Sequence, residues 1–360
     1  MKVYLTHDIF SIVRFSGATR YFLELLNQME LSSVPHSVTA GFYLCDNLRS
    51  YRQVSGLYLP GARLTTLRRH INSALQSLQL KPTSKDVVHQ TYYFPTKLSK
   101  GKLIVTVHDM IDELNLSNRK NVHPFSELKN RSCQRADRII AISESTKSDL
   151  VHFFGISPDK ISVVYHGNSL DKFSLASIPL TNQERPYLLF VGNRDDYKNF
   201  RRLLCAYSTS KSLSKEFDLI CFGGKPFTRE ELSVIQSHSL QTRVRRETGD
   251  DFALAKAYRN ATALIYPSLY EGFGLPLIEA MSMECPVVTS KGSSLTEIAG
   301  TAAAFFDPYN IEDMQSIIEQ TVFDESRRQS LVSHGSKRHQ SFTWEECYKN
   351  TMEIYTEISS

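Results

Sequence analysis

The chain has 360 residues, of which 41% are apolar and 22% charged, an ordinary composition for a soluble globular protein with room for two domains. Its six cysteines lie far apart and form no Cys-x-x-Cys pair, which argues against a zinc site or disulfide framework and fits a reducing compartment. No run of 18 apolar residues is present to cross a membrane, and residues 2–6 are too short for the core of a signal peptide.

The net charge of +4 hides an asymmetry between the two halves of the chain. Residues 1–168 hold 21 Lys and Arg against 13 Asp and Glu, a net +8, and the remainder holds 21 against 25, a net −4. A basic half attracts acidic glycans, lipid phosphates or an anionic membrane surface, although solvated surface charge explains such a bias equally well. Nucleic acid is not favoured, because no module that interleaves aromatic and basic residues is present.

The first half alternates strand and helix patterns, which favours a parallel sheet with helices on both faces. Val3–Thr6 is predicted as a strand, and a Ser-Gly-Ala-Thr loop then leads into a helix predicted from Arg20 to Met29. Gly17 in that loop allows the close approach of a phosphate, although many first strand–helix turns contain a glycine for conformational reasons alone.

Residues 45–85 are rich in arginine and lysine and follow a strand predicted at Val38–Leu44. An apolar repeat of helical period predicts an amphipathic helix over 62–80. The repeat consists of Leu64, Leu67, Ile71, Leu75 and Leu78. Such a stripe most often faces the core, which is the expectation here; the alternative is a basic amphipathic patch that meets lipid headgroups and admits a lipid-linked acceptor.

Two further strands, predicted at 86–89 and 103–107, end in residues that suit a ligand site. The first leads into the aromatic loop 90–95 and the second into His108-Asp109, and open parallel sheets bind ligands at the carboxyl ends of their strands. A structural histidine satisfied by the backbone is the alternative interpretation of His108.

The rest of the first half contains a strand predicted at 137–143, a helix at 144–153 and a strand at 161–165. Ser143 is placed to cap the helix. Residues 171–185 have low apolar content and contain Pro179, and we expect them to form the linker between two domains.

The second half opens with a strand predicted at 187–191, followed by Gly192 and then by Arg194 and Lys198 ahead of a helix. These two cations form a reasonable pyrophosphate clamp, because arginine grips phosphate with two hydrogen bonds and lysine adds a point charge. Solvated surface charge is the alternative. Two later strand ends carry loops with glycines, Gly223-Gly224 and Thr248-Gly249.

Residues 261–280 carry the most informative pattern of the chain. A buried strand at 263–266 leads into a turn with Gly272 and Gly274, and a helix opens at Leu275–Pro276, where proline is well tolerated. The glycines let the backbone approach a ligand closely, and the helix N-terminus behind them favours a phosphate. A plain glycine turn between strand and helix is the alternative.

Two carboxylates bracket this predicted anion site, Glu271 on the turn and Glu279 one helical turn later. Carboxylates so near a phosphate are better placed to accept hydrogen bonds from sugar hydroxyls than to touch the phosphate itself. After this stretch the sequence predicts strands at 286–289 and 302–306, helices over 310–340 and a final helix from Trp344 to about residue 357.

The stretch 261–280 closely resembles the donor-binding segment of retaining glycosyltransferases of the GT-B fold, in the large family four group, which carries two glutamates separated by seven residues. The resemblance covers most of the chain and implies two Rossmann-like, doubly wound parallel-sheet domains facing a cleft. The implied domains are 1–170, which binds the acceptor, and 186–340, which binds the nucleotide sugar. Residues 341–360 are expected to return to the first domain as a helix.

The resemblance also implies roles for individual residues. Glu271 and His108 would contact the transferred sugar, Glu279 the nucleotide ribose, and Arg194 with Lys198 the leaving diphosphate. Gly17 would face the donor phosphates, and the loops at 223–224 and 248–249 would flank the base. The full set of residues expected to bind the donor is Gly17, Gly192, Gly223, Gly224, Thr248, Gly249, Gly272, Phe273, Gly274, Leu275 and Glu279.

The expected function is transfer of a hexose, with retention at the anomeric carbon, from a nucleoside diphosphate sugar to a glycan acceptor in bacterial surface polysaccharide synthesis. GDP-mannose is the favoured donor and a polyprenyl-linked glycan the favoured acceptor. No cofactor or metal is expected, because no Asp-x-Asp motif stands at a predicted strand end. The expected location is the cytoplasm, with peripheral contact at the anionic inner face of the inner membrane.

Two alternatives to this function stay open. One, within the enzymes, is a GT-B sugar-nucleotide epimerase, and the other, from a different class, is a non-catalytic scaffold module that binds a nucleotide. A dinucleotide-dependent oxidoreductase is weaker, because no Gly-x-Gly-x-x-Gly motif follows either leading strand.

Overall fold

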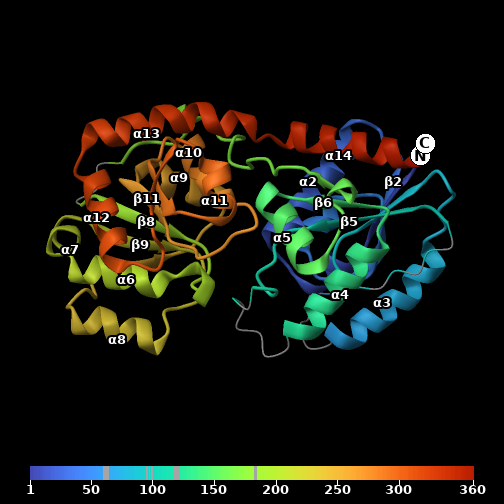
Figure 1. The fold of residues 1–360 in the computed structure, drawn as a ribbon, viewed down its shortest axis with the longest axis horizontal. Helices are drawn as coiled ribbons and strands as arrows, with labels where there is room; N and C mark the ends of the chain where they lie inside the picture. Colours follow the sequence, from blue (N-terminus) through green and yellow to red (C-terminus); the bar gives the residue numbers. More distant parts are fainter. Residues whose placement is uncertain are drawn as a thin grey trace. The chain divides into compact units, whose positions relative to one another are not determined.

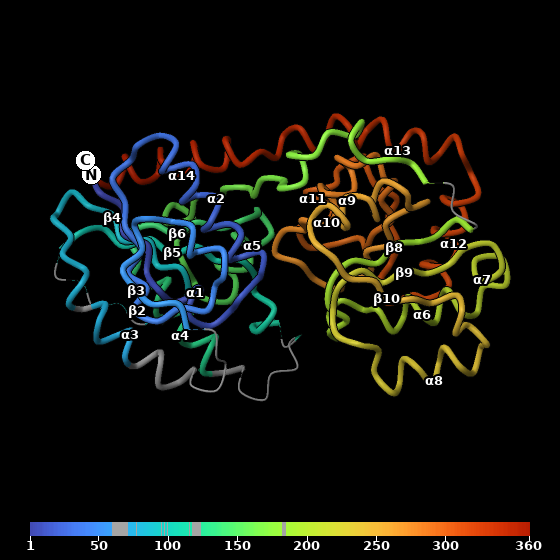
Figure 2. Tube along the Cα trace, turned by 180° about the vertical axis from the view of Figure 1, so that it is seen from behind, coloured from blue at the N-terminus to red at the C-terminus, as the bar shows by residue number. Residues whose placement is uncertain are grey.

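The computed structural model describes residues 1–59, 65–94, 96, 98, 100–114, 116, 122–181 and 185–360 (Figure 1). Within them the chain divides into two compact units. The first is built from Met1–Glu113, Arg119–Gly167 and Trp344–Ser360, and the second is Asn168–Thr343 together with Leu114–Asn118. The Cα trace in Figure 2 shows the same path from behind.

The first unit is organised around a parallel sheet with the strand order β3-β2-β1-β4-β5-β6-β7 in the described residues. Because β1 pairs with both β2 and β4, the chain leaves β1 in one direction and later returns on its other side. This is the topological switch point of the sheet. The strands are β1 (Val3–Thr6), β2 (His36–Tyr43), β3 (Val54–Tyr58), β4 (Val87–Gln90), β5 (Lys102–Val107), β6 (Arg138–Ala141) and β7 (Ile161–Val163).

Helices pack on both faces of this sheet, as the alternating sequence pattern predicts. The apolar core on one face joins strand residues to α2 and to the C-terminal helix α14, including Trp344 and Tyr355. The last helix therefore belongs to the first unit, although it is distant in sequence. The helices are α1 (Asp8–Ile12), α2 (Gly17–Leu31), α3 (Thr65–Gln79), α4 (Val122–Arg135), α5 (Glu144–Phe154) and α14 (Trp344–Ser359).

Local capping sets where two of these helices begin. Ser143 accepts a hydrogen bond from the backbone N–H of Thr146, so the predicted cap of α5 is confirmed. Helix α2 begins three residues before the predicted start at Arg20, because Ser16 and Thr19 form a reciprocal capping box. The predicted loop glycine, Gly17, is consequently the first residue of the helix.

Helix α3 is oriented opposite to the prediction. Its apolar stripe was expected in the core, but Ile71 and Leu78 are 37% and 70% exposed, while Asn72 and Gln76 are 1% and 5% exposed. Of the other predicted members Leu75 is half-buried, whereas Leu64 and the Leu67 side chain lie outside the described residues. Polar contacts therefore hold the inner face of this helix.

The contacts of Asn72 explain this orientation. Strand β1 ends where Thr6 pairs with Thr39, so the backbone of Phe42 further along β2 has no β1 residue opposite it. The Asn72 amide takes that place: Oδ1 accepts from the Phe42 N–H at 2.7 Å and Nδ2 donates to the Phe42 carbonyl at 2.8 Å. The buried Asn72 amide thus satisfies the backbone hydrogen-bonding groups of Phe42 in β2. Sequence periodicity does not report this requirement.

The second unit repeats the architecture with the strand order β10-β9-β8-β11-β12-β13 in the described residues. Its switch point lies between β8 and β11. The strands are β8 (Tyr187–Val191), β9 (Asp218–Phe222), β10 (Val244–Glu247), β11 (Ala263–Tyr266), β12 (Val287–Ser290) and β13 (Ala303–Phe306). All strand pairs in both sheets are parallel, so the predicted fold class of two Rossmann-like domains is confirmed.

Two apolar cores lie on the two faces of the second sheet. One includes residues of α6, α7, α8, α12 and α13, and the other includes residues of α9, α10 and α11. Leu170, directly before the predicted linker, and Ile178 within it are buried in the second core, so this part of the linker packs on the second unit. Residues 182–184 of that linker lie outside the described residues. The helices are α6 (Phe200–Thr209), α7 (Lys211–Glu216), α8 (Arg229–Ser237), α9 (Asp251–Asn260), α10 (Leu275–Ser282), α11 (Ser293–Ala299), α12 (Ile311–Val322) and α13 (Glu325–Arg338).

Gly41→Ala is expected to destabilise the first unit more than Gly155→Ala does. Both glycines have a positive φ, so each substitution costs about 1–2 kcal/mol in backbone strain. A Cβ at Gly41 would also collide with the Asn72 amide, whereas one at Gly155 would meet open space. Thermal unfolding of the full-length chain measures both. Equal losses for the two variants would contradict the role given to Asn72.

Candidate active site

The switch point of the second sheet brings two predicted site residues into contact. Lys198 follows β8 and Glu271 follows β11, and these strands are neighbours. Lys198 Nζ lies 2.6 Å from Glu271 Oε1, and their side chains are 13% and 11% exposed. Tyr266 completes the group: its hydroxyl accepts from Lys198 at 2.9 Å and donates to Glu271 at 2.7 Å. Sequence analysis missed Tyr266, which reads as an apolar strand residue.

The electrostatics of this group keep its charges fixed. Burial alone would lower the pKa of Lys198, but Glu271, with Tyr197 and Asp195, outweighs it and raises the pKa. Burial, followed by the charge of Glu271, raises the pKa of Tyr266 well above its usual value. Lys198 therefore remains a cation and Tyr266 a neutral phenol over the physiological pH range.

The turn after β11 is held by the beginning of helix α11. Ser294 Oγ is within 2.8 Å of both the Glu271 and the Phe273 carbonyl oxygens, and Ser293 Oγ accepts from the Glu271 N–H at 3.2 Å. Gly274 is the N-cap of α10 with φ +112°, and a Cβ there would lie 3.0 Å from Leu295. Only glycine suits this position.

Helix α10 begins at Leu275, as predicted, with proline in its first turn. The first N–H groups of a helix have no partners within it, so this terminus can bind an anion. Glu279 lies one turn into the helix, 6% exposed, and its Oε2 accepts from the Tyr258 hydroxyl at 2.9 Å. The tyrosine holds the carboxylate in one orientation.

Arg194 has different surroundings from Lys198, although both follow β8. Its Nε donates to Glu231 Oε1 at 3.0 Å and its Nη2 donates to the Lys225 carbonyl. The guanidinium also lies 4.6 Å from the centre of the Phe227 ring. Much of its hydrogen-bonding capacity is thus used within the second unit, and its contact with a diphosphate stays a prediction.

Three predicted glycines form a close backbone junction at the ends of β8 and β9. The Gly192 N–H donates to the Phe222 carbonyl at 3.0 Å, and a Cβ at Gly224 would lie 2.9 Å from the Gly192 oxygen. Gly192, Gly223 and Gly224 all have positive φ. Arg246, which sequence analysis missed, donates to the Gly224 carbonyl at 2.7 and 3.0 Å.

The loop after β10 is close to this junction in the fold, because β10 pairs with β9. Thr248 and Gly249 are exposed there. A Cβ on Gly249 would collide with Ala253 in the first turn of α9, whose N-cap is Asp250. The predicted residues of the second unit therefore follow adjacent parallel strands and gather at one edge of its sheet.

His108 and Gly17 belong to the first unit. His108 follows β5, and its ring centre lies 5.5 Å from that of Tyr21 and 6.0 Å from that of Phe22. Burial lowers its pKa to about 4, with Asp109 opposing and Lys129 adding to the effect. The imidazole is therefore neutral at pH 7. The predicted neighbour Asp109 accepts a hydrogen bond from the Ile111 N–H at 3.2 Å and so shapes the following turn.

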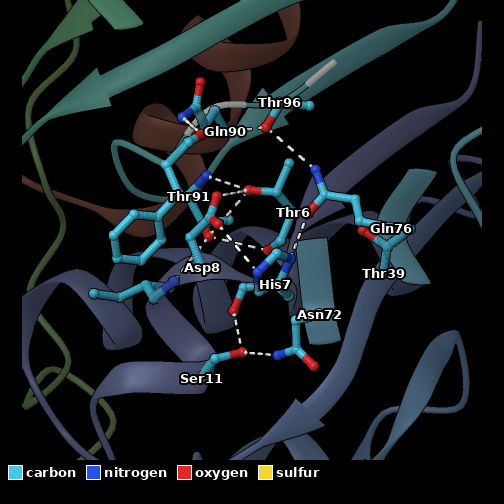
Figure 3. Close-up of polar contacts among 12 residues, drawn as sticks. Thr6, His7, Asp8, Ser11, Thr39, Asn72, Gln76, Gln90, Thr91 and Thr96 are labelled. Carbon is cyan, nitrogen blue, oxygen red and sulfur yellow. Dashed lines mark hydrogen bonds and ion pairs between the residues drawn. The ribbon is translucent and has the colours of Figure 1, made fainter. Parts of the chain in front are cut away.

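A buried polar network that sequence analysis missed lies at the switch point of the first sheet (Figure 3). Thr6 at the end of β1 donates to Asp8 at 2.5 Å and accepts from the Thr91 N–H at 2.9 Å. His7 contacts Gln76 of α3, and its Nε2 lies 3.4 Å from Asp8 Oδ1. The network connects β1, β4 and α3, and no sequence motif marks it.

Among the described residues, no group of three or more histidine, cysteine or carboxylate side chains is placed to hold a metal ion. A search of the described helices for one with the length and apolar character of a membrane crossing found none.

In comparison with known proteins, each half of the chain matches a glycosyltransferase family. The family described as "Glycosyl transferases group 1" matches residues 171–338, and "Glycosyltransferase Family 4" matches residues 15–172. O-antigen chain mannosyltransferase B of Escherichia coli is 25% identical over 98% of this chain and 92% of its own length. Serotype-specific mannosyltransferase WbdA of Escherichia coli is 24% identical over 88% of this chain, which spans 44% of that relative.

Solved structures share the fold over nearly the whole chain. Sucrose-phosphate synthase from Thermosynechococcus elongatus superposes with a TM-score of 0.79 at 18% identity, covering 99% of this chain and 98% of that one. WaaG, a glycosyltransferase involved in lipopolysaccharide biosynthesis, gives a TM-score of 0.76 at 15% identity, with 99% and 100% covered. At these identities the likeness shows the fold alone.

Proposed function

Because the chain belongs to the GT-B glycosyltransferases with group 1 and family 4 domains, we propose that it transfers mannose from GDP-mannose to a glycan acceptor with retention at the anomeric carbon. The observation that carries this proposal is the Lys198–Glu271 pair at the switch point, beside the N-terminus of α10. A cation, a carboxylate and a helix N-terminus at one sheet edge suit a sugar joined to a diphosphate.

In the proposed reaction the bond between C1 of the sugar and the β-phosphate oxygen breaks, and a bond from C1 to the acceptor oxygen forms on the same face. The acceptor hydroxyl loses its proton to the departing phosphate. Negative charge grows on the diphosphate, where Lys198 and the first N–H groups of α10 would stabilise it. Glu271 would accept a hydrogen bond from a sugar hydroxyl, and Glu279, held by Tyr258, one from the ribose.

His108 would contact the same sugar from the first unit, as a neutral ring that exchanges hydrogen bonds with a hydroxyl without adding charge. Arg194 would add charge stabilisation at the diphosphate. The junction of Gly192, Gly223 and Gly224 would flank the base together with Thr248 and Gly249. Gly17, at the first turn of α2, would face the phosphates.

The choice of mannose, GDP and a polyprenyl-linked surface glycan rests on the relatives, whose names are O-antigen and serotype-specific mannosyltransferases. Calorimetric titration with GDP and with UDP tests the base, and tighter binding of UDP would overturn the donor assignment. Mass analysis of products formed from GDP-mannose and a polyprenyl diphosphate glycan tests the acceptor. An epimerase would return an altered sugar nucleotide without a transfer product, and a scaffold would return the donor unchanged.

Lys198→Ala and Glu271→Ala are each expected to lower turnover about 10²–10³-fold, because each removes a preorganised charged contact at the reacting centre. GDP release from GDP-mannose in the presence of acceptor measures the rate. Lys215→Ala is the matched control, since Lys215 is 81% exposed and forms an ion pair with its exposed neighbour Glu216. Turnover like that of the unsubstituted enzyme in either site variant would remove the donor assignment.

Transfer is expected to persist in excess EDTA, because the proposal gives Lys198, Arg194 and the α10 N-terminus the electrostatic role that a metal ion plays in other enzymes. The rate is measured before and after chelation and dialysis. Loss of activity on chelation that magnesium or manganese restores would refute metal independence.

We also propose that α3 and its flanking segments contact an anionic membrane at the cytoplasmic face, where a polyprenyl-linked acceptor would lie. Residues 47–85 contain seven Lys and Arg and no Asp or Glu. The same region exposes Ile71 and Leu78. Anionic headgroups attract each nearby cation by roughly 1 kcal/mol, and exposed leucines can enter the interface.

Leu78→Ser is expected to weaken sedimentation with anionic liposomes, whereas Leu180→Ser is not. The two leucines are 70% and 69% exposed, but Leu180 lies in the second unit. Binding is also expected to fall with rising salt, because headgroup attraction is screened. If the protein does not sediment with anionic liposomes at low salt, the membrane proposal is wrong, while the assignment of the fold is unaffected.

A further inference from the structure

Lys129 is a buried lysine with no role in the proposed chemistry. It lies on α4 in the first unit, and its side chain is 3% exposed. Its Nζ donates to Glu113 Oε2 at 2.7 Å and to the main-chain carbonyl of Asp109 at 2.9 Å. The Tyr93 ring covers the ammonium, with its centre 5.5 Å away.

Burial of an ammonium group is costly, and a methionine or leucine would fill this position without that cost. Burial lowers the pKa of Lys129, but Asp109 and Glu113 outweigh it and raise the pKa, so the group stays charged. A retained buried charge calls for a reason beyond packing. Its contacts provide one, because both lie in the segment that directly follows His108.

We propose that Lys129 is a positioning residue for His108. Its ammonium ties the carbonyl of Asp109, the residue bonded to His108, to the carboxylate of Glu113 and so fixes the turn on which the imidazole stands. The inference rests on the proposed function in taking His108 as the group that meets the transferred sugar.

Two side-chain contacts among the described residues join the start of this turn to its end. Asp109 Oδ1 accepts from the Ile111 N–H, which closes the start of the turn, and Lys129 then joins its start to its end at Glu113. The imidazole also packs against the rings of Tyr21 and Phe22, which limit its position. A shift of the Asp109 carbonyl would therefore move the imidazole relative to the Tyr21 and Phe22 rings.

Lys129 also acts on the charge of the imidazole. After burial, its positive charge is the second cause that lowers the pKa of His108, against the opposite effect of Asp109. The titratable groups around the ring include Tyr21 and His166, whose ring centres are 5.5 and 5.6 Å away, and His89, besides Asp109 and Lys129. Removal of the Lys129 charge should therefore raise the pKa of His108 from about 4.

The test compares three variants of the full-length chain. Lys129→Arg keeps the charge, and the double variant Lys129→Met/Glu113→Gln removes both charges at similar volume, so that neither partner is left as an unpaired buried charge. Lys349→Met/Glu346→Gln is the control, because it removes an exposed lysine–glutamate pair on α14 of the same unit. Thermal unfolding verifies that each variant folds.

We expect the double variant to lose about 10²-fold in kcat with little change in donor KM, because a misplaced contact slows the chemical step while the nucleotide site belongs to the other unit. Lys129→Arg should recover most of this loss, and the control should match the unsubstituted enzyme. NMR titration of ¹³C-labelled histidines, with the His108 signal assigned by its absence in His108→Gln, should show a higher His108 pKa in the double variant.

Two outcomes overturn the inference. One is a folded double variant with unchanged kcat, and the other is a His108 signal that titrates at the same pH with and without Lys129. The NMR titration needs no substrate. If the unsubstituted chain transfers no sugar at all, the proposed function fails, while the titration still tests the link between Lys129 and His108.

Discussion

A buried ion pair between Lys198 and Glu271 organises the candidate site of the second unit. Removing two charges from water costs several kcal/mol per ion, and their attraction offsets this only when the geometry is good and the remaining hydrogen bonds are satisfied. Here the Tyr266 hydroxyl bonds both partners, and the first residues of α11 hold the backbone that carries Glu271. These contacts offset the cost of burial with a rigid arrangement at the end of the sheet, which the proposed transfer from a sugar diphosphate would also require.

Each unit places buried polar groups at the switch point, where the order of the strands in its parallel sheet reverses. In the second unit these are the lysine and glutamate just described, and in the first they form the network of Thr6, His7 and Asp8. Strand pairing ends at such an edge, so the side chains that follow must satisfy backbone groups as well as one another. Asn72 does this for β2, and its burial turns the apolar side of α3 outward.

Arg194 and Lys198 illustrate how tertiary contacts separate residues that look alike in sequence. Both are cations in the loop after β8, and both were expected to bind a diphosphate. Lys198 pairs with Glu271 at the switch point, whereas Arg194 pairs with Glu231 of α8. Glu231 lies 37 residues further along the chain and also caps its own helix. The capping role alone explains a glutamate at this position, so the sequence gives no sign of its contact with Arg194.

The sequence by itself determined the alternation of strands and helices, the confirmed fold class and the helix start at Leu275, because these depend on local periodicity, capping and glycine or proline preferences. It also identified Lys198 and Glu271 as candidates, although not their contact. Only the tertiary structure decided which face of α3 is buried, where Arg194 points, and that Tyr266, Arg246 and Lys129 adjoin predicted residues. These features arise from side chains that meet across adjacent strands or between a helix and a strand end, and the spacing of residues along one chain does not record such encounters.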